Sequence, residues 1–131
     1  MGRRPASVAE VAERINGGET SSSAIGEFLD EYYASVLAVR MGMLSDIPPP
    51  IRLKDKRLSE VTDAYLSAVA EGLTYRDGFG APGWTRQPCR FLDKPWFASD
   101  IQGLWPLLLM ESPVFFRRRQ LFVSGNVLSR A

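Results

Sequence analysis

The clearest pattern of apolar and polar positions lies near the start of the chain. Apolar side chains recur at helical spacing at Val8, Val11, Ala12 and Ile15. Ser7 and Glu10 have the S-x-x-E spacing of a capping box. Asn16-Gly17-Gly18 then supplies residues that tolerate the left-handed conformation at a helix end. The pattern therefore predicts a first helix over residues 8–16.

A second, longer amphipathic segment follows a serine-rich connector. Its acidic residues and Arg40 fall on one helical face, and most of its apolar residues fall on the other. The apolar set is Ile25, Phe28, Leu29, Tyr32, Val36, Leu37 and Met43. Three prolines at residues 48–50 cannot continue a helix. We predict one helix over residues 24–44.

A third helical pattern begins after Asp55, a suitable N-cap residue. Its inward positions have the 3–4 spacing of a helix and are Leu58, Val61, Tyr65, Ala68, Val69 and Leu73. The pattern ends around residues 77–80, where two glycines occur. Residues 78–95 then hold glycine, proline and scattered aromatic residues without periodicity, which predicts a long aromatic-rich connector on the surface.

The C-terminal part contains the most apolar segment of the chain. Residues 104–110 are apolar almost all round, which predicts a helix buried near the centre of the fold. Pro106 fits the first turn of such a helix. Ser112 followed by Pro113 has the sequence of another helix start. Residues 121–123 form a further apolar run that could adopt a short strand.

These patterns predict an all-α protein with a single compact domain over residues 1–131 and four to six helices. Every long periodic segment has the helical period, and none alternates as a strand would. A chain of 131 residues that is 45% hydrophobic can fill one core. The longest apolar run is too short to cross a bilayer, and no signal-peptide core is visible near the N-terminus, so we expect a soluble, cytoplasmic protein with no membrane contact.

The composition removes much of the usual catalytic and metal-binding chemistry. The chain has no histidine, the commonest general base and transition-metal ligand. Its single cysteine, Cys89, has no internal disulfide partner and no histidine to activate it, so we interpret it as a half-buried thiol in a reducing compartment. We therefore expect no enzymatic activity, no metal and no cofactor.

Charge is nearly balanced over the chain but not between its halves. With 16 basic and 15 acidic residues, the protein lacks an overall field that attracts nucleic acid. Residues 66–131 hold eight Lys and Arg against five Asp and Glu, so an anionic partner would meet this half. The first two predicted helices resemble a helix-turn-helix in outline only, because the second carries Glu27, Asp30 and Glu31. DNA binding is therefore not expected.

Three consecutive arginines, Arg117, Arg118 and Arg119, are the strongest functional signal in the charge pattern. On a helix they point about 100° apart and cannot form one flat patch. One interpretation is a solvated helix face with one arginine packed on a neighbouring phenylalanine. Another is a docking site for an acidic protein surface or a phosphate-bearing ligand. Nucleic-acid readout is the third.

Aromatic residues are concentrated in the same half, with nine of fourteen from Phe79 onward. They either close a loop-rich part of the core or anchor a partner, since tryptophan and arginine are frequent interface hot spots. Trp96 and Phe97, where the connector rejoins the fold, are the preferred anchor pair. Phe115 and Phe116 are neighbours on a predicted helix, so one of them should be at least partly available to a partner.

The C-terminal third also carries an ordered series of motifs. It reads Arg90-Phe91-Leu92, Pro95-Trp96-Phe97, Leu104, Leu107, Leu109, Glu111-Ser112-Pro113, Phe116 to Arg119, Phe122-Val123, Asn126 and Leu128 to Ala131. This series resembles a poorly characterised family of small bacterial proteins with an E-S-P-x-x-F-R-R-R-x-x-F-V-x-x-N-x-L-S-R-A ending. Members are often encoded beside a nucleotidyltransferase-like gene, and the resemblance implies an antitoxin-like role.

Two functions remain open from the sequence. The protein is either an antitoxin that binds and neutralises a toxin, as the resemblance implies, or a non-catalytic regulatory or structural module that binds another protein. In both cases the expected contact residues are Trp96, Phe97, Phe115, Phe116, Arg117, Arg118 and Arg119. A homo-oligomer is also left open.

Overall fold

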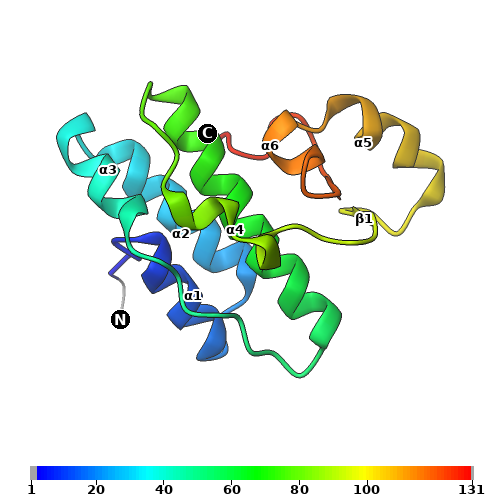
Figure 1. The fold of residues 1–131 in the computed structure, drawn as a ribbon, viewed down its shortest axis with the longest axis horizontal. Coiled ribbons are helices and arrows are strands. Elements are labelled where there is room, and N and C mark those ends of the chain that lie inside the picture. Colours follow the sequence, from blue (N-terminus) through cyan, green and yellow to red (C-terminus); the bar gives the residue numbers. More distant parts are fainter. Residues whose placement is uncertain (1–2, 131) are drawn as a thin grey trace.

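Helices make up most of the regular structure in the computed structural model, which describes residues 3–130. Within those residues the α-helices are α1 (Val8–Asn16), α2 (Ser21–Ala34), α3 (Leu37–Ser45), α4 (Lys56–Arg76), α5 (Trp105–Glu111) and α6 (Val114–Arg117). Three 3₁₀ helices are η1 (Gly83–Arg86), η2 (Pro88–Arg90) and η3 (Gln102–Leu104), and two short strands are β1 (Trp96–Phe97) and β2 (Leu121–Phe122). The predicted all-α, single-domain fold is confirmed (Figure 1). Residues 1, 2 and 131, including the last residue of the C-terminal signature, lie outside the described part.

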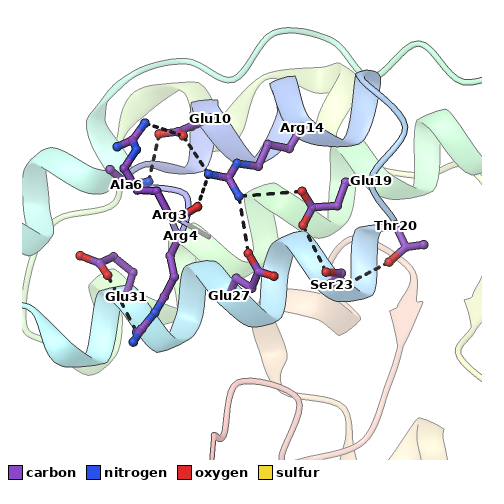
Figure 2. A network of polar contacts seen from close by, with 10 residues as sticks. All are labelled: Arg3, Arg4, Ala6, Glu10, Arg14, Glu19, Thr20, Ser23, Glu27 and Glu31. Carbon is purple, nitrogen blue, oxygen red and sulfur yellow. Dashed lines mark hydrogen bonds and ion pairs between the residues drawn. The ribbon is translucent and has the colours of Figure 1, made fainter. Parts of the chain in front are cut away.

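Helix α1 forms where the pattern predicts it. The Ser7 hydroxyl accepts a hydrogen bond from the Glu10 amide at 3.1 Å, and the Glu10 carboxylate accepts one from the Ala6 amide at 3.1 Å. Figure 2 shows Arg14 of α1 reaching toward α2, where its guanidinium lies 3.5 Å from the Glu27 carboxylate. The Arg14–Glu27 ion pair joins α1 to α2 at the surface. The apolar side of α1 fills the core with Val8, Val11, Ala12 and Ile15.

The predicted single helix over residues 24–44 is wrong, because the chain breaks between α2 and α3. Ser35 and Val36 have extended backbones with ψ values of 150° and 156°. Helix α3 then starts at Leu37 and is a separate element (Figure 1). As a result Val36 and Leu37, predicted on the buried face, are 67% and 54% exposed.

Arg40 caps the end of α2 at this break. Its Nε donates to the carbonyl oxygens of Tyr32 and Ser35 at 2.9 and 3.0 Å, and its guanidinium lies 3.2 Å from the Asp77 carboxylate. The last carbonyls of a helix have no partner inside the helix. Here the arginine supplies donors that a continuing helix would otherwise provide. Local periodicity cannot reveal this arrangement, since Asp77 is 37 positions from Arg40.

Helix α4 runs through the middle of the molecule (Figure 1). Asp55 caps it as predicted by accepting a hydrogen bond from the Leu58 amide at 3.1 Å. Neighbouring segments approach it closely at small residues: a Cβ on Gly72 would lie only 2.8 Å from the Leu128 side chain. The prediction that Leu58 points inward is wrong. It is 44% exposed because it borders an open cavity in place of a packed neighbour.

The connector over residues 78–95 contains η1 and η2, and both lie against α4. It contributes more to the core than a surface loop would. Trp84 is 5% exposed, and its indole donates to the Leu44 carbonyl oxygen at 2.9 Å. Arg90 is also buried, over the face of the Trp84 ring. The prediction that Cys89 is half-buried is wrong, because this residue of η2 is exposed and only Arg90 of η2 is buried.

In the C-terminal third, the short strands β1 and β2 pair in parallel, although residues 98–120 lie between them. Trp96 aligns with Leu121, and Phe97 aligns with Phe122, so the apolar run at residues 121–123 does contribute a strand. The prediction of a buried central helix over residues 104–110 is wrong. Helix α5 lies at the edge of the molecule (Figure 1). No helix among residues 3–130 is both long and apolar enough to cross a membrane.

Candidate protein-binding surface

Large apolar side chains are exposed along α5 and the residues on either side of it. We call this set the α5 surface; its members are Ile101 (64% exposed), Leu104 (43%), Leu107 (52%), Leu109 (46%), Met110 (79%) and Val114 (49%). Only Leu108 of α5 is buried. Contiguous exposed apolar patches are uncommon on monomeric proteins and mark interaction sites. The α5 surface is therefore a candidate interaction site. A second set of exposed apolar side chains lies around α3 and consists of Val36, Leu37, Val39, Met41 and Ile47.

An aromatic stack holds the start of α5 against the two strands. The Phe97 ring lies parallel to the Trp105 ring, with centroids 4.3 Å apart, and its other neighbour is the Phe122 ring at 5.0 Å. The Trp105 indole donates to the Ser99 carbonyl oxygen at 2.9 Å. These contacts fix the orientation of α5, so its exposed side chains are presented by a rigid support.

Ser112 holds the other end of α5. Its hydroxyl lies 2.6 Å from the Leu108 carbonyl oxygen and accepts a hydrogen bond from the Val123 amide at 2.8 Å. The prediction that Ser112 caps the following helix is wrong, because no side chain caps α6. The hydroxyl instead joins the end of α5 to the residue after β2.

The predicted anchor residues Trp96 and Phe97 form strand β1, and their side chains lie in different environments. Successive side chains of a strand point to opposite faces, and the two residues accordingly have different neighbours. Phe97 belongs to the stack beneath α5, whereas Trp96 packs against the main core and lines a cavity beside α2 and α4. Both are half-buried. Of the two, only Phe97 lies next to the α5 surface.

Phe115 and Phe116 also have different surroundings. Phe116 is fully buried, with its ring edge-on to Tyr65 at a centroid distance of 5.1 Å. Phe115 is half-buried and packs on Tyr75, which is itself 74% exposed. Phe115 is thus the one of the pair with surface available to a partner.

The three arginines separate into surface and interior positions. Arg117 and Arg118 are exposed, whereas Arg119 is fully buried. Arg118 and Arg119 each contact one oxygen of the Glu71 carboxylate, at 2.9 and 2.6 Å. Arg117 donates to the Ser112 carbonyl oxygen at 2.7 Å and is the arginine nearest in sequence to the α5 surface.

Arg119 connects several segments of the C-terminal half. Its guanidinium donates to the carbonyl oxygens of Thr85 and Phe115 at 2.7 and 2.8 Å, and it lies 4.5 Å from the centre of the Phe91 ring. Burial lowers the pKa of Arg119 below its ordinary value, and the bond to Glu71 opposes that shift. Arginine remains charged in proteins, so this buried cation depends on its partners. Arg119 therefore has an architectural role.

The apolar character of α5 was visible in the sequence, but its exposure was not. A helix that is apolar all round is typical of a buried element, and the same pattern occurs when a partner covers it. Among residues 3–130 there is no group of three or more Cys, Asp and Glu side chains that could hold a metal ion. The exposed side chains of α5 are apolar, so the binding that this surface can support is apolar contact with a partner.

Comparisons with protein-family models, curated proteins and solved structures found no match to this chain. The resemblance of the C-terminal third to an antitoxin-like family therefore stays an expectation, and the geometry of the site has to carry the functional argument.

Proposed function

We propose that this protein is a non-catalytic protein-binding module and that its partner covers the α5 surface. The observation that carries the proposal is the exposure of six large apolar side chains over residues 101–114, on a short helix with a single buried residue. Burying such side chains contributes about 1.5–3 kcal/mol each when it is complete. A partner that covers α5 would gain much of that free energy.

The exposure of α5 on most sides favours a particular kind of binding site on the partner. A helix exposed on most sides fits a hydrophobic groove, which is a common mode of peptide recognition. The aromatic stack and Ser112 hold α5 in place before binding, so little conformational entropy is lost on association. The exposed Arg117 borders the surface, and an acidic residue at the rim of the groove would complement it.

Neutralisation of a nucleotidyltransferase-like toxin, which the sequence resemblance implies, is the specific form of this function. In that form α5 occupies a groove on the toxin, and the partner is the product of a neighbouring gene. A regulatory or structural partner is the alternative. Both forms need the same apolar contact, so the test of the contact comes first.

The test is co-purification of the tagged protein with the product of its neighbouring gene, for the natural protein and two variants. A Leu107→Asp, Met110→Asp variant places charges on α5, and the matched control Val36→Asp, Val39→Asp places them on the exposed apolar side chains near α3. We expect only the α5 variant to lose the complex, by about 2 kcal/mol or more.

Two results would contradict the proposal. Loss of binding in the α3 variant alone would move the interface to α3, and unchanged binding in both variants would exclude both apolar surfaces. Circular dichroism of each variant confirms that the fold is intact.

A further inference from the structure

A cavity of about 340 Å³ lies on a different part of the molecule from the α5 surface. It is bounded by α2, α4, Trp96 of β1 and the C-terminal segment over residues 127–130. Its apolar lining includes Ile25, Leu29, Val61, Tyr65, Trp96 and Val127. Small-molecule sites are concave and mostly apolar, with a few polar groups, and this cavity has both the size and the lining of such a site.

Two polar groups of the lining are not used by the chain itself. Neither the Tyr65 hydroxyl nor the Trp96 indole N–H has a hydrogen-bond partner within residues 3–130. The other two tryptophans differ, because the indoles of Trp84 and Trp105 each donate to a backbone carbonyl oxygen at 2.9 Å. The Tyr65 and Trp96 side chains are half-buried, and neither polar atom is among the fully buried ones that lack a partner, so both are open to solvent at the cavity. The cavity therefore offers donors that a ligand could use.

Arg130 is the charged residue among those that line the cavity. Asp30 accepts hydrogen bonds from its Nε and one terminal nitrogen, Nη2, at 2.8 and 3.0 Å. The remaining terminal nitrogen, Nη1, lies 3.1 Å from where a Cβ on Gly26 would be, so the guanidinium rests on the α2 backbone. Glycine at this position leaves room for it. Nη1 is thus a cationic donor beside an apolar cavity.

We propose that this cavity binds a small amphipathic monocarboxylate, with its aliphatic body against the apolar lining and its carboxylate toward Arg130. Arg130 decides the head group: Asp30 accepts from its Nε and Nη2 and leaves Nη1 as a donor at the cavity, which favours an acceptor-rich group such as a carboxylate. An indole can only donate a hydrogen bond, which again favours a ligand rich in acceptors. A volume of 340 Å³ holds about ten groups the size of a water molecule, which fits a medium-chain acid such as octanoate.

The C-terminal segment is positioned to form one wall of this site. The Tyr33 hydroxyl donates to the Leu128 carbonyl oxygen at 2.8 Å, and Leu128 packs on Gly72 of α4. Val127 and Arg130, on either side of Leu128, line the cavity. The segment is therefore held at its centre while the residues beside that point face the ligand.

The experiment is a titration of the full chain with sodium octanoate, followed by isothermal calorimetry and by amide chemical shifts. Octan-1-ol, which has the same chain without the carboxylate, is the matched ligand. Saturable binding of octanoate, with shifts at Trp96 and residues 25–29, is the expected result. Absence of saturable binding at millimolar octanoate, or equal binding of the alcohol, would overturn the proposal.

Two variants sharpen the result. Arg130→Met should weaken octanoate binding by about tenfold, as expected for loss of a charged hydrogen bond, while binding of the alcohol stays the same. Arg52→Met removes the same charge at an exposed position away from the cavity and should change nothing. Equal effects of the two substitutions would show a general charge effect and would reject the assigned site.

A third variant tests the cavity without altering charge. Val127→Trp places a large side chain at the wall and should abolish octanoate binding while the thermal midpoint stays near that of the natural chain. Octanoate bound equally well by this variant would place the ligand elsewhere. Because no residue of the α5 surface lines the cavity, these outcomes are independent of the partner-binding test.

Discussion

The N-terminal helices and the C-terminal third are held together by different interactions. In α1 and α4 the apolar side chains repeat at helical spacing and most are buried. In the C-terminal third the elements are short, and their positions depend on a buried arginine, an aromatic stack and side-chain bonds to the backbone. There the most apolar helix faces outward. The apolar positions of α1 and most of those of α4 are therefore buried, whereas most apolar side chains of α5, like those around α3, are exposed.

We expect the largest loss of stability from substitution of a buried polar residue, Arg119, in the C-terminal third. Arg119→Met removes a fully buried guanidinium and leaves the carbonyl oxygens of Thr85 and Phe115 without their donor. Breaking a buried ion pair from one side costs about 3–5 kcal/mol. Chemical denaturation measures the change in the free energy of unfolding.

The matched control is Arg117→Met, two positions earlier and exposed. A surface substitution of this kind changes stability by about 0.5 kcal/mol or less. Similar losses in both variants would show that Arg119 has no special architectural role.

A pair of leucines tests whether apolar residues act differently in the two regions. Leu73 in α4 is fully buried, and Leu73→Ala should lower the free energy of unfolding by about 2–5 kcal/mol. Leu107 in α5 is 52% exposed, and Leu107→Ala should change it by about 0.5 kcal/mol or less. Thermal unfolding followed by circular dichroism compares the two. A large loss with Leu107→Ala would mean that α5 is packed in solution.

Ser112 tests how the C-terminal third is connected. Ser112→Ala leaves the buried Val123 amide without its acceptor, which costs about 1–3 kcal/mol. Ser124→Ala, at an exposed serine nearby, is the control and should be nearly neutral. Hydrogen exchange of the Val123 amide gives a local readout, and faster exchange is expected only in the Ser112 variant.

The smallest expected effect belongs to Glu10, in the N-terminal region. The hydrogen bond from the Ala6 amide, helped by the charges of Arg3 and Arg14, holds the pKa of Glu10 below its ordinary value of 4.5 against the opposing effect of partial burial. A depressed pKa contributes stability above the unfolded value, and this contribution is lost as pH falls through the folded value.

Glu10→Gln should therefore lower the thermal midpoint at neutral pH, and the difference from the natural chain should disappear in acid well below pH 4.5. Thermal melts across that range measure it. A difference that stays constant with pH would show that the carboxylate charge is not what stabilises the start of α1.

The sequence by itself determined the class of fold and the ends of its best-defined helices. Val8 to Ile15 and Val61 to Leu73 repeat at the period of a helix, and Ser7 and Asp55 act as caps through bonds to residues three positions away. Such contacts join residues that are close in the sequence, so they can be predicted from the sequence alone. The concentration of aromatic and arginine residues in the C-terminal half was equally visible.

Only the tertiary structure decided which of those residues face inward. Arg40 caps the end of α2 while paired with Asp77, and Arg119 is buried beside Glu71 and Phe91. The partners Asp77, Glu71 and Phe91 are distant in sequence. The direction of α5 depends on Phe97 stacking on Trp105, although Leu107 to Met110 read as a core segment. An apolar run in the sequence indicates that its side chains favour burial. Whether they are buried by the protein's own fold or left for a partner to bury depends on the three-dimensional arrangement of the chain.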